Sequence, residues 1–370
     1  MIRLVHQYLD LPTQPGARHL FRDLSLQSHQ SISNRIKIMT RMKIDETRVP
    51  QDGRFHLDVN GKGIDFRVAT LPTPNGEKIA IRILDPEAGI KTLEDLGFEG
   101  RNLQMMNEAI KKPYGMILIT GPTGSGKSTT LYALLQLLNK ENVNIISLED
   151  PIEYYVEGVN QSQIRPEIGY DFATGLRNIL RQDPNIIMVG EIRDKETAQL
   201  ATQAALTGHL VLSTLHTNNA LGVIPRLIDM GVDPFLLPST LILAVAQRLV
   251  RKLCPESREA VEAGSASYQL AENDVKSMPQ VFRDEILAQK PWQIYKSLVS
   301  PQCPNGTSGR IGIYETLVMT PALQQIIAEG ATEGKVAKEA ESQRMLTMRH
   351  DGIQKVLHGL IGIEQLYEVT

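Results

Sequence analysis

A glycine-rich run that contains one lysine is the clearest chemical signal in this sequence of 370 residues. The run GPTGSGKSTT, residues 121–130, follows the apolar run MILIT and precedes the helical pattern LYALLQLL. It fits the pattern G-x-x-x-x-G-K-[ST], in which glycines let backbone N–H groups converge on phosphate oxygens at the start of a helix. The run therefore predicts a site for the phosphates of a nucleotide.

The predicted phosphate-binding residues are consecutive in the chain. We expect Lys127 to neutralise the β- and γ-phosphates, Ser128 to reach Mg²⁺, and Thr129 to approach the α-phosphate. The full set is Gly121, Pro122, Thr123, Gly124, Ser125, Gly126, Lys127, Ser128 and Thr129.

A second chemical group comes from another apolar run. NIIMVGE places Glu191 at the carboxyl end of a predicted strand, where ligands bind in parallel sheets. A carboxylate there is well placed to orient or deprotonate an attacking water. The preceding position, where a magnesium-holding aspartate is usual, is Gly190. Mg²⁺ is therefore expected to rely on Ser128, on water and on an indirect contact from Glu191.

Two further clusters stand near the ends of predicted strands. Glu149, Asp150 and Glu153 follow the run NIISL, and bundled acids could bind metal or position water. His209 and His216 flank the run LVLSTL, and either could sense a γ-phosphate. From the residues alone, a functional role and a structural role both stay open for these clusters.

The elements that must position these groups follow from the hydrophobic pattern. Apolar runs that alternate with helical patterns predict an α/β fold with a doubly wound, mostly parallel sheet. The apolar stretch 235–250 is predicted as a buried helix, and Thr320-Pro321 as the start of another. The runs predicted as strands cover residues 116–120, 144–148, 185–189 and 209–214.

The pattern changes along the chain and suggests several regions. Residues 28–42 have helical spacing, and the stretch 54–84 predicts a meander of strands with turns at Asn60-Gly61 and Asn75-Gly76. The predicted division is 1–88, a truncated N-terminal α/β domain; 89–112, a linker; 113–252, the nucleotide-binding core; 253–312, an insertion; and 313–370, a helical C-terminal region.

Composition narrows the function classes. Hydrophobic residues make up 42% and charged residues 22% of the chain, which is typical of a soluble globular protein. A net charge of −3 and 5% aromatic residues disfavour a nucleic-acid groove. Two cysteines cannot build a disulfide framework and suit a reducing cytosol. With no signal-peptide or membrane-span pattern, any membrane association is expected to go through a partner.

Four runs occur together and in this order: GPTGSGKSTT, SLEDPIEY, RQDPNIIMVGEIRD and ATQAALTGHLVLSTLHTN. Together they closely resemble the ATPases of type II secretion and type IV pilus assembly, from about Ser31 to the C-terminus. The resemblance implies a RecA-like P-loop domain, ATP and Mg²⁺ as ligands, and a homo-hexameric motor. Its implied place is the cytoplasmic face of the inner membrane, reached through platform proteins, without direct contact to nucleic acid.

The resemblance also assigns residues. Arginines of the N-terminal domain reach the nucleotide phosphates in such motors, and the matching positions are Arg67 in DFRVATLP and Arg82 in IAIRIL. Arg193, in the same box as Glu191, has an open role. The implied catalytic set is Glu191, Glu149, His216, Arg67 and Arg82. PQDGR and LILAVAQRLVRKLCP resemble the secretion and pilus-extension branch of the family.

That branch commonly carries two Cys-x-x-Cys pairs that bind zinc. This chain has Cys254-Pro-Glu-Ser257 and Ser300-Pro-Gln-Cys303, so that serine replaces one thiol of each pair. Serine is a poor zinc ligand at neutral pH, and a structural zinc site wants four deprotonated ligands. We therefore expect no bound zinc.

Several alternatives stay open at this point. Family members usually carry a further N-terminal domain, so the chain is expected to be a short form or a fragment. A related hexameric motor linked to DNA uptake or conjugation, a phosphoryl-transferring kinase, and a nucleotide-binding regulatory subunit each share the phosphate loop.

Overall fold

The computed structural model describes residues 2–3, 23–24, 26–59, 62–84 and 91–370. The chain divides into two compact units, Met1–Ile90 and Lys91–Thr370. In the described part, no helix has the length and apolar character needed to cross a membrane.

In its described residues, the N-terminal unit has one helix packed on a three-stranded antiparallel meander, and a separate two-stranded sheet made of β1 and β2. The helix α1 (Leu26–Met39) packs on one face of the sheet β3-β4-β5, where the buried ion pair between Lys37 and Glu77 joins helix to sheet at 2.6 Å. The predicted helix and meander are confirmed, although Asn60-Gly61 lies outside the described residues. The strands are β1 (Ile2–Arg3), β2 (Asp23–Leu24), β3 (Gln51–Val59), β4 (Lys62–Thr73) and β5 (Gly76–Leu84).

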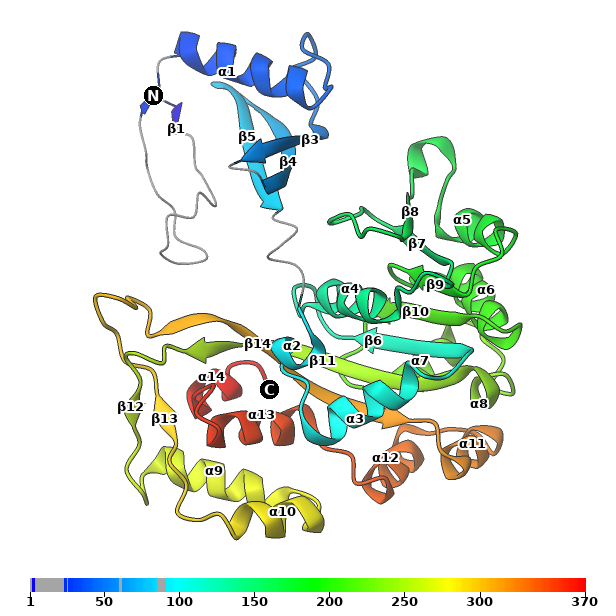
Figure 1. Ribbon diagram of the computed structural model, residues 1–370, viewed down its shortest axis with the longest axis vertical. Helices are drawn as coiled ribbons and strands as arrows, with labels where there is room; N and C mark the ends of the chain where they lie inside the picture. Colours follow the sequence, from blue (N-terminus) through cyan, green and yellow to red (C-terminus); the bar gives the residue numbers. More distant parts are fainter. Residues whose placement is uncertain (1, 4–22, 25, 60–61, 85–90) are drawn as a thin grey trace. The chain divides into compact units, whose positions relative to one another are not determined.

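The second unit is built on a seven-stranded sheet in the order β14-β11-β6-β10-β9-β7-β8 (Figure 1). Neighbours from β11 to β8 are parallel, and β14 runs antiparallel to β11. Both faces are covered, which is why the central strands are runs of Ile, Leu and Val. The bounds are β6 (Gly115–Thr120), β7 (Ile145–Glu149), β8 (Asn160–Gln163), β9 (Ile186–Val189), β10 (Leu210–Leu215), β11 (Leu241–Leu253) and β14 (Thr307–Val318).

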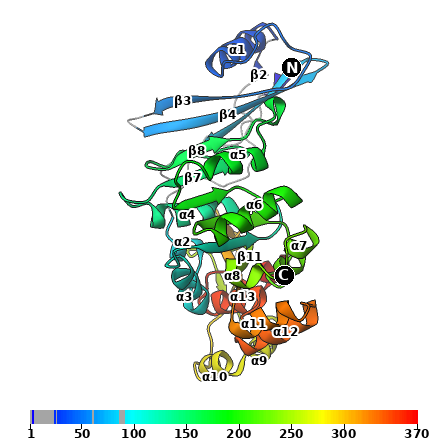
Figure 2. The same ribbon diagram turned by 90° about the vertical axis from the view of Figure 1, so that its right-hand side faces the viewer.

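Helices cover the sheet on two sides (Figures 1 and 2). One side packs against α2 (Leu93–Leu96), α3 (Gly100–Ala109) and α4 (Lys127–Leu138). The other packs against α5 (Phe172–Ile179), α6 (Lys195–Leu206), α7 (Val223–Asp229) and α8 (Leu237–Thr240). A 3₁₀ turn, Pro166–Ile168, precedes α5. The predicted α/β fold with a mostly parallel sheet is confirmed.

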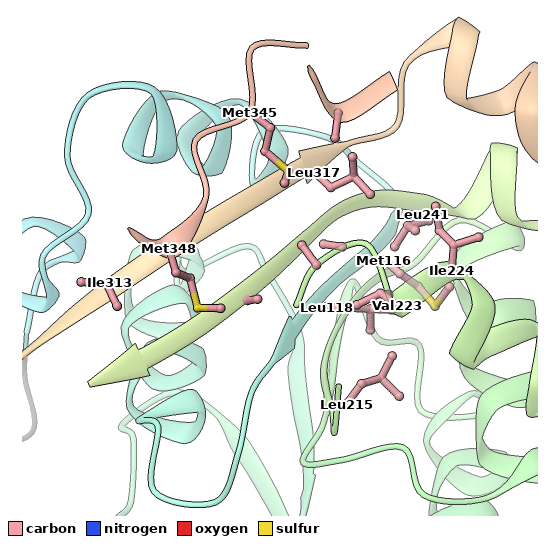
Figure 3. Close-up of a cluster of buried hydrophobic side chains, with 14 of the residues drawn as sticks. Met116, Leu118, Leu215, Val223, Ile224, Leu241, Ile313, Leu317, Met345 and Met348 are labelled. Atoms are coloured by element: carbon pink, nitrogen blue, oxygen red, sulfur yellow. The ribbon is translucent and has the colours of Figure 1, made fainter. Parts of the chain in front are cut away.

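Four helices close the chain and share the core of the second side. Met348, at the start of α13, lies in the same buried cluster as Leu118 on β6 and Val223 on α7 (Figure 3). The nucleotide-binding sheet and the C-terminal helices therefore form one core. These helices are α11 (Pro321–Ala328), capped by Thr320 as predicted, α12 (Glu333–Ser342), α13 (Met348–Leu357) and α14 (Ile363–Tyr367).

Between β11 and β14 the chain makes an excursion with its own small elements. Cys254 and Cys303, near its two ends, are joined in a disulfide with Cα atoms 6.6 Å apart. Two thiols that sequence reasoning assigned to a reduced state are therefore paired. The elements are β12 (Glu259–Ala260), α9 (Ala266–Ser277), α10 (Gln280–Leu287) and β13 (Tyr295–Lys296).

The structure differs from the sequence-based expectation in three places. The predicted helix over 235–250 was wrong: after one turn of α8, Leu241–Leu253 is a strand buried between β6 and β14. The expected linker contains α2 and α3, which place Leu93 and Met106 in the core. The expected boundary at residue 312 falls inside β14, which pairs with β11. All three differences have the same cause: contacts with segments distant in the sequence. Strand pairing makes 241–253 a strand and extends β14 past residue 312, and core packing orders α2 and α3.

Candidate active site

The phosphate loop connects the central strand β6 to α4. Gly121, Gly124 and Gly126 have φ angles of +144°, +81° and +86°, a region that side chains beyond glycine rarely adopt. Helix α4 begins at Lys127, and its N-cap residue Gly126 gives it no side-chain cap. The strand, the turn and the free helix start predicted from the glycine pattern are confirmed.

The Lys127 ammonium is turned back into this loop. Nζ donates to the carbonyl oxygens of Gly121 at 2.8 Å and Pro122 at 3.1 Å. Burial lowers the pKa of Lys127, and the nearby Glu191 carboxylate opposes that shift. A buried ammonium whose partners are neutral carbonyls is electrostatically prepared for an anion.

Glu191 lies just beyond β9 with a cationic or polar partner on each oxygen. Arg193 is 2.5 Å from Oε1, and His216 Nε2 is 3.1 Å from Oε2. The side chain of Glu191 is only 14% exposed, whereas those of Arg193 and His216 are 62% and 46% exposed. The carboxylate is thus held at the carboxyl edge of the sheet by residues that solvent reaches.

The segment after β10 is fastened to the start of the phosphate loop. Thr217 N donates to Thr120 Oγ1 at 2.7 Å, and the two hydroxyl groups are 2.8 Å apart. Thr214 Oγ1 donates to the Gly190 carbonyl at 2.8 Å. Strands β6, β10 and β9 therefore present Lys127, His216 and Glu191 at one edge.

Glu149 is at the same edge, but its carboxylate is engaged. It is 4% exposed and accepts hydrogen bonds from Tyr132 of α4, from Ser147 at 2.5 Å and from Gln161 at 3.0 Å. Asp150 is exposed and Glu153 half-buried. The predicted catalytic role of Glu149 stays a prediction, and its contacts show an acid that fixes Tyr132 and the end of β7.

The two histidines of the predicted pair lie at opposite edges of the sheet. His209 precedes β10, beside the start of β6, and its Nδ1 is 2.9 Å from the Ala204 carbonyl. His216 follows β10 at the other end. Only His216 is brought to Glu191.

The residues present fit a nucleotide polyphosphate. The Ser125 hydroxyl is buried and, within the described residues, has no hydrogen-bond partner, while Lys127 and the uncapped start of α4 supply donors. No group of three or more His, Cys, Asp or Glu positioned for a metal ion occurs in the described part of the chain. Mg²⁺ there would depend on phosphate oxygens and water besides Ser128, as is usual for this ion.

The residues of the two Cys/Ser pairs are also close together, because the disulfide joins Cys254 of one pair to Cys303 of the other. Cys303 N donates to Ser300 Oγ at 3.0 Å, and the buried Ser257 Oγ lacks a partner among the described residues. The expectation that no zinc binds here stays a prediction.

Arg67 and Arg82 lie in the N-terminal unit, where they face the same way. Strand register pairs Arg54 with Arg67 and Arg67 with Arg82, so the three occupy one row across the sheet. Helix α1 packs on the opposite face, where His29 and Lys37 contact Glu77, and Thr40, just after the helix, lies against Gly53. Like charges directly opposite each other destabilise a sheet. Because a bound anion would offset this repulsion, the row is a candidate anion site.

Sequence reasoning missed several participants. Arg54 stands in the quoted run PQDGR, but only strand register sets it beside Arg67. Gln247, on β11, contacts the phosphate loop, and Tyr132, on α4, contacts Glu149. Both stand in runs quoted above, LILAVAQRLVRKLCP and LYALLQLL, but the sequence gives neither residue a role at the site.

Comparison with known proteins identifies the family to which this chain is similar. The model of the family described as type II/IV secretion system protein matches residues 18–368. The type II secretion system protein E of Pseudomonas aeruginosa is 46% identical over 337 residues, 91% of this chain and 64% of that protein. The type IV pilus assembly ATPase PilB of Acinetobacter baylyi is 44% identical over 356 residues, 96% of this chain and 60% of its own length. The chain therefore spans less than two thirds of these relatives.

Solved structures agree on the fold. The pilus retraction motor PilT with bound ADP has a TM-score of 0.62 and 29% identity, covering 86% of this chain and 77% of its own. The ATPase DotB of Legionella pneumophila has a TM-score of 0.65 over 96% of this chain and 86% of its own, at 23% identity. The predicted RecA-like α/β fold is confirmed.

Proposed function

The chain belongs to the type II/IV secretion system protein family, and from that premise we propose that it is a homo-hexameric ATPase motor for type II protein secretion or type IV pilus assembly. One observation carries the proposal. The buried Lys127 of the phosphate loop follows β6, and the Glu191 carboxylate follows β9, at the same edge of the sheet on either side of β10.

ATP binding would use the loop. Lys127 exchanges its two carbonyl partners for β- and γ-phosphate oxygens, and the N–H groups at the start of α4 face the same phosphates. Ser128, exposed in the first turn of α4, and Glu191, through water, would hold Mg²⁺. Bound Mg²⁺ would neutralise charge on the phosphates.

Glu191 is the group that orients and deprotonates the attacking water. Its two partners support this role, because Arg193 and His216 fix both carboxylate oxygens and leave the remaining lone pairs for water. His216 and Arg193 act as positioning residues, and His216 is exposed enough to sense a γ-phosphate.

Arg67 and Arg82, in the N-terminal unit, are the arginines that we propose to contact nucleotide phosphates in the hexamer. Their shared row with Arg54 supports a role in phosphate contact, since bound phosphate offsets three like charges. Closure of the N-terminal unit on ATP, and its release after hydrolysis, would move platform proteins at the cytoplasmic face of the inner membrane.

The variant Glu191→Gln tests the proposal. The amide keeps the size of the side chain but cannot accept a proton, so ATP binding should persist and phosphate release should fall by at least about a hundredfold. Glu262→Gln, an exposed acid of the excursion, is the matched control and should leave turnover unchanged. Near-normal turnover in Glu191→Gln would remove Glu191 from this role. Transfer of phosphate to an acceptor would instead indicate a kinase. Stimulation of turnover by DNA that weakens with salt would instead indicate a motor linked to nucleic acid.

A further inference from the structure

Gln247 is a buried polar side chain that the chemistry proposed above does not use. It lies on β11 and is 1% exposed. Strand β11 is the neighbour of β6, and Ala246 pairs with Thr120, the last residue of β6. Gln247 is therefore beside the point where the chain leaves the sheet and enters the phosphate loop.

Both ends of its side-chain amide are bonded to the loop and the helix that follows. Nε2 donates to the Ser125 carbonyl at 2.7 Å, and Oε1 accepts from Thr130 Oγ1 at 2.9 Å. A carbonyl oxygen can only accept, so the NH₂ end of the amide must face Ser125. One side chain thus holds the last part of the loop and the first turn of α4 in a fixed relation.

The loop glycines are fitted to this contact. A Cβ on Gly121 would lie 2.4 Å from the Gln247 backbone oxygen, and one on Gly126 would lie 2.9 Å from Gln247 Nε2. A Cβ on Gly124 would meet nothing within 4 Å. Close approach to the Gln247 backbone therefore requires glycine at position 121, in addition to its positive φ angle, whereas a Cβ at position 126 would displace the Gln247 amide from its contacts.

We infer that Gln247 is a positioning residue for nucleotide binding, which keeps the phosphate loop in the conformation that presents its N–H groups and Lys127 to phosphate. This inference rests on the proposed function, because it assumes that the loop binds a nucleotide. Without Gln247, the Ser125 carbonyl would lose its donor. A buried carbonyl oxygen that lacks a donor would accept a hydrogen bond from the nearest free N–H group. In this loop, those N–H groups are the ones that would bind phosphate.

The test compares three variants of the full chain. Gln247→Leu keeps the volume and removes both bonds. Thr130→Val removes the bond to Oε1, together with the longer contact of Thr130 Oγ1 with the Gly126 carbonyl oxygen at 3.4 Å, and keeps the bond from Gln247 to Ser125. The matched control is Gln343→Leu, because Gln343 also donates to and accepts from one backbone position, Val318, away from the loop. For each, ADP affinity is measured by calorimetric titration, KM and kcat by phosphate release, and Tm by thermal unfolding.

Gln247→Leu is expected to raise the Kd for ADP and the KM for ATP about tenfold, which corresponds to ~1.4 kcal/mol. Thr130→Val should raise both by a smaller factor, and Gln343→Leu should lower Tm with both constants unchanged. Gln247→Leu with wild-type Kd and KM would overturn the inference. If Gln247→Leu does not fold, a wild-type Kd in Thr130→Val has the same meaning. ADP binding with no ATP hydrolysis in the wild type would contradict the proposed function and leave this test intact.

Discussion

The side chains of Glu191 and His216 meet at the carboxyl ends of the neighbouring strands β9 and β10, with His216 Nε2 3.1 Å from Glu191 Oε2. The two residues are 25 positions apart in the sequence. Parallel pairing of Ser213 with Val189 brings the residues beyond each strand together. The contact makes the orientation of the Glu191 carboxylate, the proposed general base, dependent on a residue that follows another strand.

Removing that contact should slow hydrolysis. His216→Ala is expected to lower kcat at least about tenfold, because the Glu191 carboxylate loses one of the two groups that orient it. Phosphate release at saturating ATP measures the effect. His209→Ala is the control, since His209 lies at the opposite edge of the sheet, and it should change kcat less than about twofold. Equal effects of the two variants would contradict the assigned geometry.

Arg54 should behave like its two neighbours in the row. Arg54→Ala is expected to lower kcat/KM for ATP by a factor similar to Arg67→Ala and Arg82→Ala, because all three supply positive charge to one surface. Arg35→Ala, which removes an exposed arginine of α1 on the covered side of the sheet, should have no effect. Wild-type kinetics of Arg54→Ala beside impaired Arg67→Ala would separate Arg54 from the proposed anion site.

The disulfide should stabilise the second unit. Cys254 and Cys303 close a segment with a sequence separation of 49 residues. A cross-link over such a segment restricts the unfolded chain by about 4 kcal/mol in the chain-entropy model. Reduction should therefore lower Tm in calorimetry, and the variant Cys254→Ser/Cys303→Ser should not respond to reductant. Labelling of both cysteines by a thiol reagent in the native, unreduced protein would show that the bond does not form.

Stability should also depend on pH through His358. Its Nδ1 is 3.1 Å from Glu99 Oε2, and this hydrogen bond raises the pKa of His358 above its ordinary value of 6.5. The folded state therefore holds the proton more tightly than the unfolded state. The stabilisation is fully present below the unfolded pKa and is lost as pH rises through the folded pKa.

His358→Gln should lack this part of the pH dependence, measured as the free energy of unfolding in urea. The side chain is 59% exposed, so solvent screening limits the difference to below about 1 kcal/mol. Burial lowers the pKa of His350, an effect of the opposite sign that both proteins share. Wild type and variant with identical pH profiles would show that the Glu99 contact is absent in solution.

The sequence by itself determined the local parts of this protein. The spacing of Gly121, Gly126 and Lys127 requires a turn between a strand and a helix, because positive φ angles and a free helix start are local properties. The run NIIMVGE likewise placed Glu191 at a strand end, since an apolar run followed by a small residue and an acid is a local pattern. Neither inference needed a partner from elsewhere in the chain.

Only the tertiary structure decided which distant residues meet. The stretch Leu241–Leu253 has an apolar pattern that suits a buried helix or a buried strand, and its place between β6 and β14 makes it a strand. That placement brings the Gln247 side chain into hydrogen-bonding contact with Ser125 of the phosphate loop. Strand register sets Arg54 beside Arg67, turns His216 toward Glu191 and leaves His209 at the far edge. Hydrogen-bond register is a relation between segments, and no single segment encodes it.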